Sequence, residues 1–176
     1  TARQLAFRMA RHFINDLPDE ELTGRMAAAY LGSGGNLNAL AQAMLDHPLA
    51  WPPAQAKIKQ PRELLLSGYR ALGARFGDGR RLLHDMEVLG QPPYRAPGRN
   101  GWSDDGTAWL RPGAAAARLS WAGAAAHQGR GPAGPAFAAA VLPRSPADDL
   151  QRWLQLAGSG AESRALVFAS PQFQRR

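Results

Sequence analysis

The sequence predicts an all-α fold, arranged as a single irregular domain of about eight or nine helices over residues 1–176. Apolar residues recur three and four positions apart along most of the chain, as on the buried face of a helix. No segment alternates polar and apolar residues over the length of a strand, and no hairpin turn signal is present. With 176 residues and no cysteine, the chain can bury a core without a disulfide.

Proline, glycine and capping residues mark the ends of the expected helices. Pro61 and Pro112 suit a first helical turn, Asn36 and Ser145 are expected N-caps, and the glycine-rich run 32–35 ends the second helix. The expected helices cover residues 2–15, about 18–32, 36–47, 61–73, a segment around 82–89, 112–128, 136–142, 146–157 and 161–170.

Six of these helices carry a stripe of apolar side chains that we expect to face the core. The stripes are Leu5, Met9 and Phe13; Leu22, Met26 and Tyr30; Leu37, Leu40, Ala41, Met44 and Leu45; Leu64, Leu65, Gly68 and Leu72; Leu82, Leu83, Met86 and Leu89; and Leu119, Trp121 and Ala125.

Residues 90–112 interrupt the helical pattern and predict a long, structured loop. The segment holds four prolines and four glycines and has no sustained period of 3.6 or 2. Connections of this length are commonly functional, and the aromatic residues in this one argue against disorder. The loop is therefore the first place to look for a binding site.

A ligand or partner site is predicted on this loop. Trp102 and Trp109 offer flat faces for stacking on a sugar or an aromatic group, and the polar residues between them can orient a ligand. The alternative is that both rings turn inward and hold the loop on the helices. The candidate binding residues are Tyr94, Arg95, Asn100, Trp102, Asp104 and Trp109.

The chain is basic, with a net charge of +7 and 21 Lys and Arg residues, of which only Lys57 and Lys59 are lysines. Such a charge raises nucleic acid or another polyanion as a partner. The basic residues are spread along the chain, with no basic run longer than a pair. A solvated, Arg-rich surface explains this distribution better than a dedicated patch, so we do not expect nucleic acid as the partner.

Several separated segments resemble, in order, the C-terminal part of a bacterial family known as domain of unknown function eighteen hundred. They are residues 2–13 (ARQLAFRMARHF), 34–45 (GGNLNALAQAML), 57–72 (KIKQPRELLLSGYRAL), 90–110 (GQPPYRAPGRNGWSDDGTAWL) and 170–176 (SPQFQRR). The chain departs from the family pattern after Trp102, where Ser103 stands in place of an expected proline. The loop can therefore have a different shape here.

The resemblance implies an all-helical fold and no agreed catalytic residues. It also implies an exported bacterial protein, in the periplasm or outside the cell, often encoded beside another exported protein. We expect this chain to be the C-terminal part of a longer protein, with any targeting segment upstream of Thr1. No apolar stretch approaches the length of a membrane span.

His84 and Asp85 form a dipeptide that occurs in helical metal-dependent phosphohydrolases, where His47 and Asp148 or Asp149 would complete a ligand set. A dipeptide is common by chance, and the four histidines lack a tight ligand spacing. We therefore expect no metal, no cofactor and no catalytic residue in this chain.

The function that these observations favour is a non-catalytic helical module that binds another exported protein or a glycan through the loop. The alternative is a hydrolase-type enzyme, metal-dependent or not, whose active site needs the missing N-terminal part. Binding of nucleic acid or a polyanion through the Arg-rich surface ranks third.

Overall fold

The computed structural model describes residues 1–52, 57–73 and 79–176, and the chain divides into two compact units, Thr1–Lys57 and Ile58–Arg176. We call them unit 1 and unit 2 and describe each by itself. The described residues form ten α-helices, and the only extended pairing among them is an isolated antiparallel bridge between Ile58 and Arg175. The predicted all-α fold is confirmed. The prediction of a single domain stays a prediction.

Unit 1 is built from three helices and one short 3₁₀ turn: α1 Ala2–Phe13, α2 Glu20–Gly32, α3 Leu37–Leu45 and η1 Pro48–Ala50. The alanines of α1 are buried, and Leu22, Met26 and Leu40 pack with them in one apolar cluster. Small side chains let helices approach closely, so the buried face of α1 is its alanine face. The predicted position of Phe13 in the core is wrong, because its side chain is 61% exposed.

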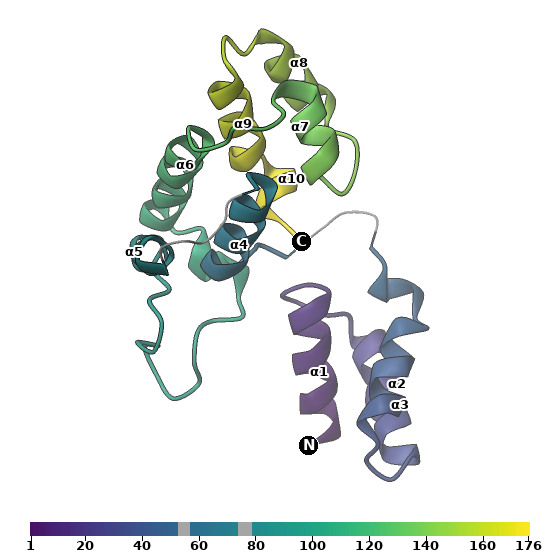
Figure 1. The fold of residues 1–176 in the computed structure, drawn as a ribbon. Helices are drawn as coiled ribbons and strands as arrows, with labels where there is room; N and C mark the ends of the chain where they lie inside the picture. Colours follow the sequence, from purple (N-terminus) through teal and green to yellow (C-terminus); the bar gives the residue numbers. More distant parts are fainter. Residues whose placement is uncertain (53–56, 74–78) are drawn as a thin grey trace. The chain divides into compact units, whose positions relative to one another are not determined.

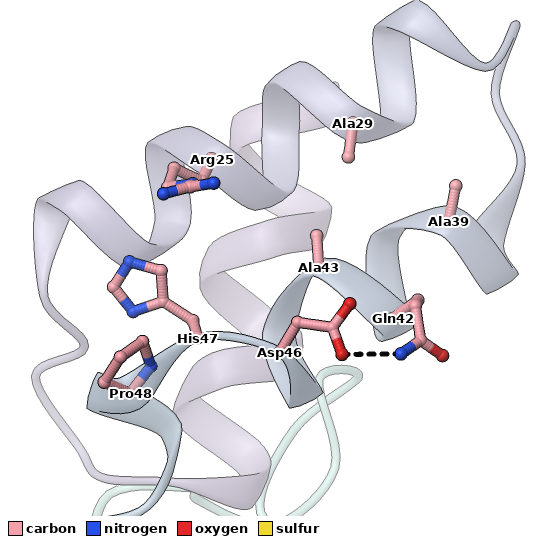
Figure 2. A pocket seen from close by; sticks show the side chains of 8 residues that line it. All are labelled: Arg25, Ala29, Ala39, Gln42, Ala43, Asp46, His47 and Pro48. Carbon is pink, nitrogen blue, oxygen red and sulfur yellow. Dashed lines mark hydrogen bonds between the residues drawn. The ribbon is translucent and has the colours of Figure 1, made fainter.

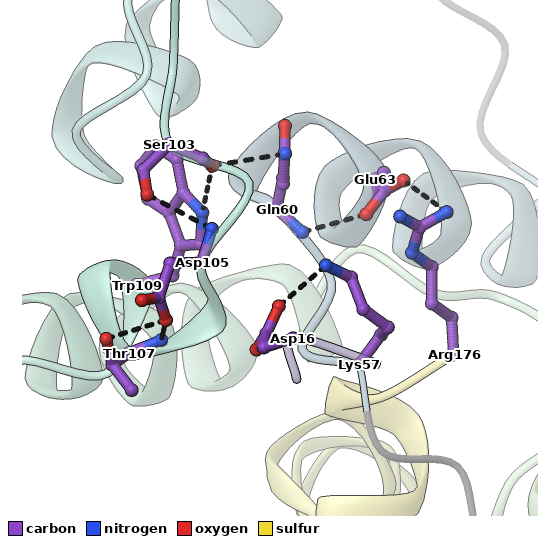
Figure 3. A network of polar contacts seen from close by, with 9 residues as sticks. All are labelled: Asp16, Lys57, Gln60, Glu63, Ser103, Asp105, Thr107, Trp109 and Arg176. Atoms are coloured by element: carbon purple, nitrogen blue, oxygen red, sulfur yellow. Dashed lines mark hydrogen bonds and ion pairs between the residues drawn. The ribbon is translucent and has the colours of Figure 1, made fainter. Parts of the chain in front are cut away.

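Side-chain caps define the helix starts in unit 1. Asn36 accepts a hydrogen bond from the backbone N–H of Asn38 at 2.9 Å, which confirms it as an N-cap. Asp19 caps α2 in the same way through Glu21 at 2.8 Å, so this helix begins at Glu20 rather than at Pro18. An ion pair between Lys57 Nζ and Asp16 Oδ1, 2.7 Å apart, ties the end of unit 1 to the α1–α2 turn (Figure 3).

In unit 2, four helices (α6, α7, α8 and α10) pack against α9, and α4 packs against α5 (Figure 1). Phe168 of α9 is fully buried among three rings, with centroid distances of 5.7 Å to Trp121, 5.5 Å to Phe137 and 4.9 Å to Phe173. The elements are α4 Pro61–Ala71, α5 Gly79–Val88, η2 Gly106–Trp109, α6 Pro112–Ala126, α7 Gly134–Val141, α8 Asp148–Leu156, α9 Gly160–Ala169 and α10 Pro171–Gln174.

Three sequence predictions in unit 2 are wrong in detail. Leu119 is 57% exposed, because α6 turns Trp121 and Ala125 inward together with Arg118. In an alanine-rich helix the apolar stripe is wide, and the neighbouring elements decide which part of it is buried. Leu83 of α5 is likewise exposed. Ser145 does not cap α8, which begins at Asp148 after Ala147.

Gly68 allows α4 and α6 to approach each other closely. A Cβ atom added at this position would lie 2.3 Å from Cη2 of Trp121. The indole of Trp121 therefore rests directly on the backbone of α4, beside Tyr69, whose ring centroid is 6.1 Å away. Trp121 of α6 therefore packs directly against α4.

Arg118 is a buried arginine that joins three distant parts of unit 2. Its Nε donates to the carbonyl of Trp109 at 3.0 Å, Nη1 donates to Oε1 of Gln174 at 2.7 Å, and Nη2 donates to the carbonyl of Lys59. Burial lowers the pKa of Arg118 to about 10. The cation is held by neutral acceptors, and it fixes the end of the 90–112 loop to the start of α4 and to the C-terminus.

Within the described ranges, no helix is both long and apolar enough to cross a lipid bilayer.

Candidate functional site

The second half of the loop, residues 103–109, is fastened to the body of unit 2. Trp109 is 6% exposed, and its Nε1 donates to the carbonyl of Ser103 at 3.1 Å. Gln60 Nε2 donates to the same carbonyl at 3.3 Å (Figure 3). Asp105 caps η2 by accepting from the N–H of Thr107 at 2.9 Å. The carbonyl of Ser103 thus receives two side-chain donors, and this half of the loop works as a clasp.

The first half, residues 90–95, follows the end of α5 and is held at Gln91 and, through an ion pair with Glu87, at Arg95. Gln91 is buried, with Oε1 accepting from the N–H of Arg62 at 2.8 Å and Nε2 donating to Oε1 of Gln60 at 3.0 Å. Three residues later, Tyr94 is 106% exposed. Between Gln91 and Arg95, Tyr94 therefore projects into solvent.

Tyr94 has a φ of +60° and is the only non-glycine with a positive φ among the residues that the structure describes. A bulky residue in this region is strained, and such strain is concentrated at functional positions. No burial compensates for the strain, because the ring faces solvent. Tyr94 therefore combines a positive φ with a fully exposed ring.

An open groove of about 440 Å³ lies between α5 and the first half of the loop. We call it the α5 groove. Its lining residues are Arg80, Leu83, His84, Glu87, Pro92, Pro93, Tyr94 and Arg95. An ion pair between Arg95 and Glu87 joins its two walls. Exposed apolar and aromatic side chains thus lie next to the charges of Arg95 and Glu87. Small-ligand sites combine such groups.

The structure brings two of the six predicted binding residues into this groove, Tyr94 and Arg95. The other four do not line it. Trp109 is buried and offers no stacking face, whereas Trp102 is half-buried with its ring centroid 6.1 Å from that of Trp109. Asn100 and Asp104 are exposed elsewhere on the loop.

The second wall of the groove was missed from the sequence. It is formed by α5, and His84 stands on it beside Leu83 and Glu87. In the sequence, His84 stands out only as a candidate metal ligand. The sequence places Leu83 and His84 four and three residues before Glu87, so the three side chains share one face of α5. This pattern does not distinguish a groove from an ordinary helix surface.

Asp85, on the adjacent face of α5, belongs to a buried polar cluster. It accepts a hydrogen bond from the hydroxyl of Tyr69, and Arg81 Nε lies 3.9 Å from its Oδ2. Burial and the hydrogen bond to Asp85 raise the pKa of Tyr69, while Arg81 and Trp121 oppose the rise. In the part of the chain that the structure describes, no three His, Cys, Asp or Glu residues gather where they could hold a metal ion.

The third proposed metal ligand, His47, lies in unit 1. It is buried, its Nδ1 accepts from the N–H of Leu49 at 3.3 Å, and its Nε2 is 3.6 Å from Glu21 Oε1. His47 therefore has contacts within its own unit that account for its position.

His47 also borders a second hollow, of about 440 Å³, between α2 and α3 (Figure 2). Three alanines form its floor, and Gln42 and Asp46 on its rim bond to each other at 2.7 Å. The hollow reflects the small side chains of the two helices. It lacks the exposed aromatic ring and the strained backbone of the α5 groove.

The family model described as Protein of unknown function (DUF1800) matches residues 1–175. The chain belongs to this family. The match confirms the resemblance noted in the sequence, over essentially the whole chain. No curated protein and no solved structure matches the chain.

Proposed function

We propose that this DUF1800 chain is a glycan-binding module and that the α5 groove is its binding site. The observation that carries the proposal is Tyr94, a fully exposed aromatic ring on strained backbone at the rim of a groove. A flat ring stacks on the apolar face of a sugar, and the strain of its backbone is explained if the position of the ring is what matters.

The polar residues of the groove support a glycan over a protein. Arg80, His84 and Glu87 offer both donors and acceptors, as the hydroxyl groups of a sugar require. The volume of about 440 Å³ lies in the range of small-ligand sites. A stable protein interface instead needs roughly 800 Å² from each partner around a buried aromatic or apolar centre.

The proposal is tested by screening the protein against an array of bacterial and plant glycans and measuring the affinity for the best one by calorimetry. Replacing Tyr94 by Ala removes the stacking face, and we expect affinity to fall about three- to tenfold. Trp153→Ala is the matched control, because Trp153 is an exposed aromatic residue of α8 outside the groove. If no glycan binds, or if both variants bind like the wild type, the proposal fails.

Export is a further part of the proposal, supported by the family resemblance. We expect the full-length protein to be recovered in the periplasmic or extracellular fraction of the bacterium that produces it. Recovery in the cytoplasm alone would contradict this.

A further inference from the structure

The α5 groove carries more positive than negative charge. Its lining holds two guanidinium groups, those of Arg80 and Arg95, and one carboxylate, that of Glu87. The same sign prevails in the surrounding unit. Unit 1 has five basic and five acidic residues, whereas unit 2 has sixteen basic and nine acidic ones, so the net charge of +7 belongs to unit 2. A ligand that approaches the groove is therefore favoured by a negative charge.

Arg95 uses only part of its guanidinium within the protein. Its Nη2 makes the ion pair with Glu87, while Nε and Nη1 have no hydrogen-bond partner among the residues that the structure describes. The ring of His84, on the α5 wall of the groove, likewise makes no hydrogen bond within the described part of the chain. The groove thus offers N–H donors to a ligand, and its one carboxylate is already engaged.

The ion pair between Arg95 and Glu87 is open to exchange. The side chain of Arg95 is 62% exposed and that of Glu87 is 57% exposed. Ion pairs this exposed contribute little free energy, because water competes for both charges. A carboxylate brought by a ligand can accept from the remaining N–H groups of Arg95, or it can displace Glu87 and take the planar fork of the guanidinium.

Tyr94 and Arg95 are consecutive residues, and both line the groove. In a uronic acid the carboxylate is attached to C5, at the edge of the pyranose ring. A uronate stacked on an aromatic face therefore presents its carboxylate to the side, where a guanidinium beside that face can bind it. A neutral hexose has a hydroxymethyl group at the same carbon, which makes only a neutral hydrogen bond.

We propose that the α5 groove binds acidic glycans and that the sugar stacked on Tyr94 is a uronate whose carboxylate binds Arg95. This inference rests on the proposed function of the groove. It adds the chemical class of the glycan, and it makes Glu87 the residue that occupies Arg95 when no glycan is bound.

The test compares each acidic glycan with its own uncharged form. The probes are tetrasaccharides of galacturonate, of mannuronate and of hyaluronan, each also prepared as the carboxyl methyl ester, and the affinities are measured by calorimetry. Esterification removes the charge and keeps the rings and the linkages. We expect at least one acid to bind about tenfold more tightly than its ester, because a charge-assisted hydrogen bond is lost.

Arg95→Gln should lower the affinity for the acid to that for the ester, and so remove the preference. Arg99→Gln is the matched control, because Arg99 is an exposed arginine of the same loop that does not line the groove. This variant makes the same change in net charge and should keep the preference. Equal losses in the two variants would mean that the overall charge of unit 2 attracts the glycan, which overturns the inference.

Glu87→Gln separates ligand binding from a structural role of the ion pair. The substitution releases Arg95 from a competing carboxylate, so the affinity for the acid should rise about two- to fivefold while that for the ester stays the same. If the ion pair only held the loop in place, its loss would lower both affinities. A fall in the affinity for the acid would therefore overturn the assignment of Arg95.

A tetrasaccharide of galactose 6-sulfate, with its desulfated form, tests whether any negative group is sufficient. The sulfate lies farther from the ring than a C5 carboxylate, so we expect a smaller preference for the charged form. An equal or larger preference would replace the uronate by a sulfated sugar and overturn the assignment.

The neutral members of the glycan array separate this inference from the proposed function. Binding of a neutral glycan that depends on Tyr94, together with esters that bind as tightly as their acids, keeps the glycan site and overturns its acidic class. If neither the array nor any acidic tetrasaccharide gives binding, both proposals are wrong.

Discussion

Each half of the 90–112 loop carries an aromatic residue, but one of the two is buried and the other is exposed. Residues 103–109 end in a buried tryptophan whose N–H and carbonyl are both bonded within unit 2. Residues 92–95 include a tyrosine that contacts solvent on strained backbone. An aromatic residue in a Pro- and Gly-rich loop can therefore fasten the loop or stay exposed. The hydrogen bonds of its neighbours show which role it has.

The clasp half depends most strongly on Arg118. Replacing Arg118 by Met keeps the apolar stem but leaves the carbonyls of Lys59 and Trp109 and the amide of Gln174 without their donor. We expect the free energy of unfolding to fall by roughly 2–3 kcal/mol, measured by urea denaturation. Arg152→Met, on the exposed face of α8, is the control and should change it little. Equal stability of both variants would show that the clasp does not hold the loop.

The carbonyl of Lys59 accepts a hydrogen bond from Arg118, and the ammonium group of the same residue makes the free energy of unfolding depend on pH. Burial lowers the pKa of Lys59 to about 8, although its ammonium lies 4.1 Å from the Phe173 ring centroid. Between this value and the ordinary 10.5 the unfolded chain binds more protons, so stability should rise with pH in that window. Lys59→Met should be more stable than the wild type near pH 7, by about 1 kcal/mol.

This difference should shrink as the pH rises above about 8. Urea denaturation of both proteins at a series of pH values measures it. A difference that stays constant with pH would show that Lys59 is not the titrating group.

Substitution of Tyr94, in the exposed half of the loop, should raise the free energy of unfolding, and by less than the changes expected at Arg118 and Lys59. Tyr94→Gly relieves the positive φ and removes no packing, so we expect the free energy of unfolding to rise by roughly 0.5 kcal/mol in thermal or urea denaturation. Glycan affinity should fall as in Tyr94→Ala. A loss of stability would mean that Tyr94 has a structural role.

Much of the fold could be predicted from local signals. Pro61 and Pro112 open α4 and α6, and Asn36 caps α3, because these effects depend on one turn of chain. The sequence does not predict the four-residue helix α10, because Pro171 marks the end of one helix and also begins the next. The loop was located correctly, and two of its six candidate residues line the groove.

The rest of the site could not be predicted, because it depends on contacts between segments far apart in the chain. Nothing near Trp109 in the sequence shows that Arg118 will donate to its carbonyl, or that Gln60 will donate to the carbonyl of Ser103. Arginine is ordinarily a surface residue, and Arg118 is buried only because three distant acceptors meet around it. His84 similarly gained its place beside Tyr94 from the docking of the loop on α5.

The sequence by itself determined the all-α class, the family and most helix ends, because periodicity, caps and breakers act over a few residues. Only the tertiary structure decided which aromatic ring is buried and which is exposed. Burial is a property of the surroundings that distant segments supply, and Trp109 and Tyr94 look alike until those surroundings are known.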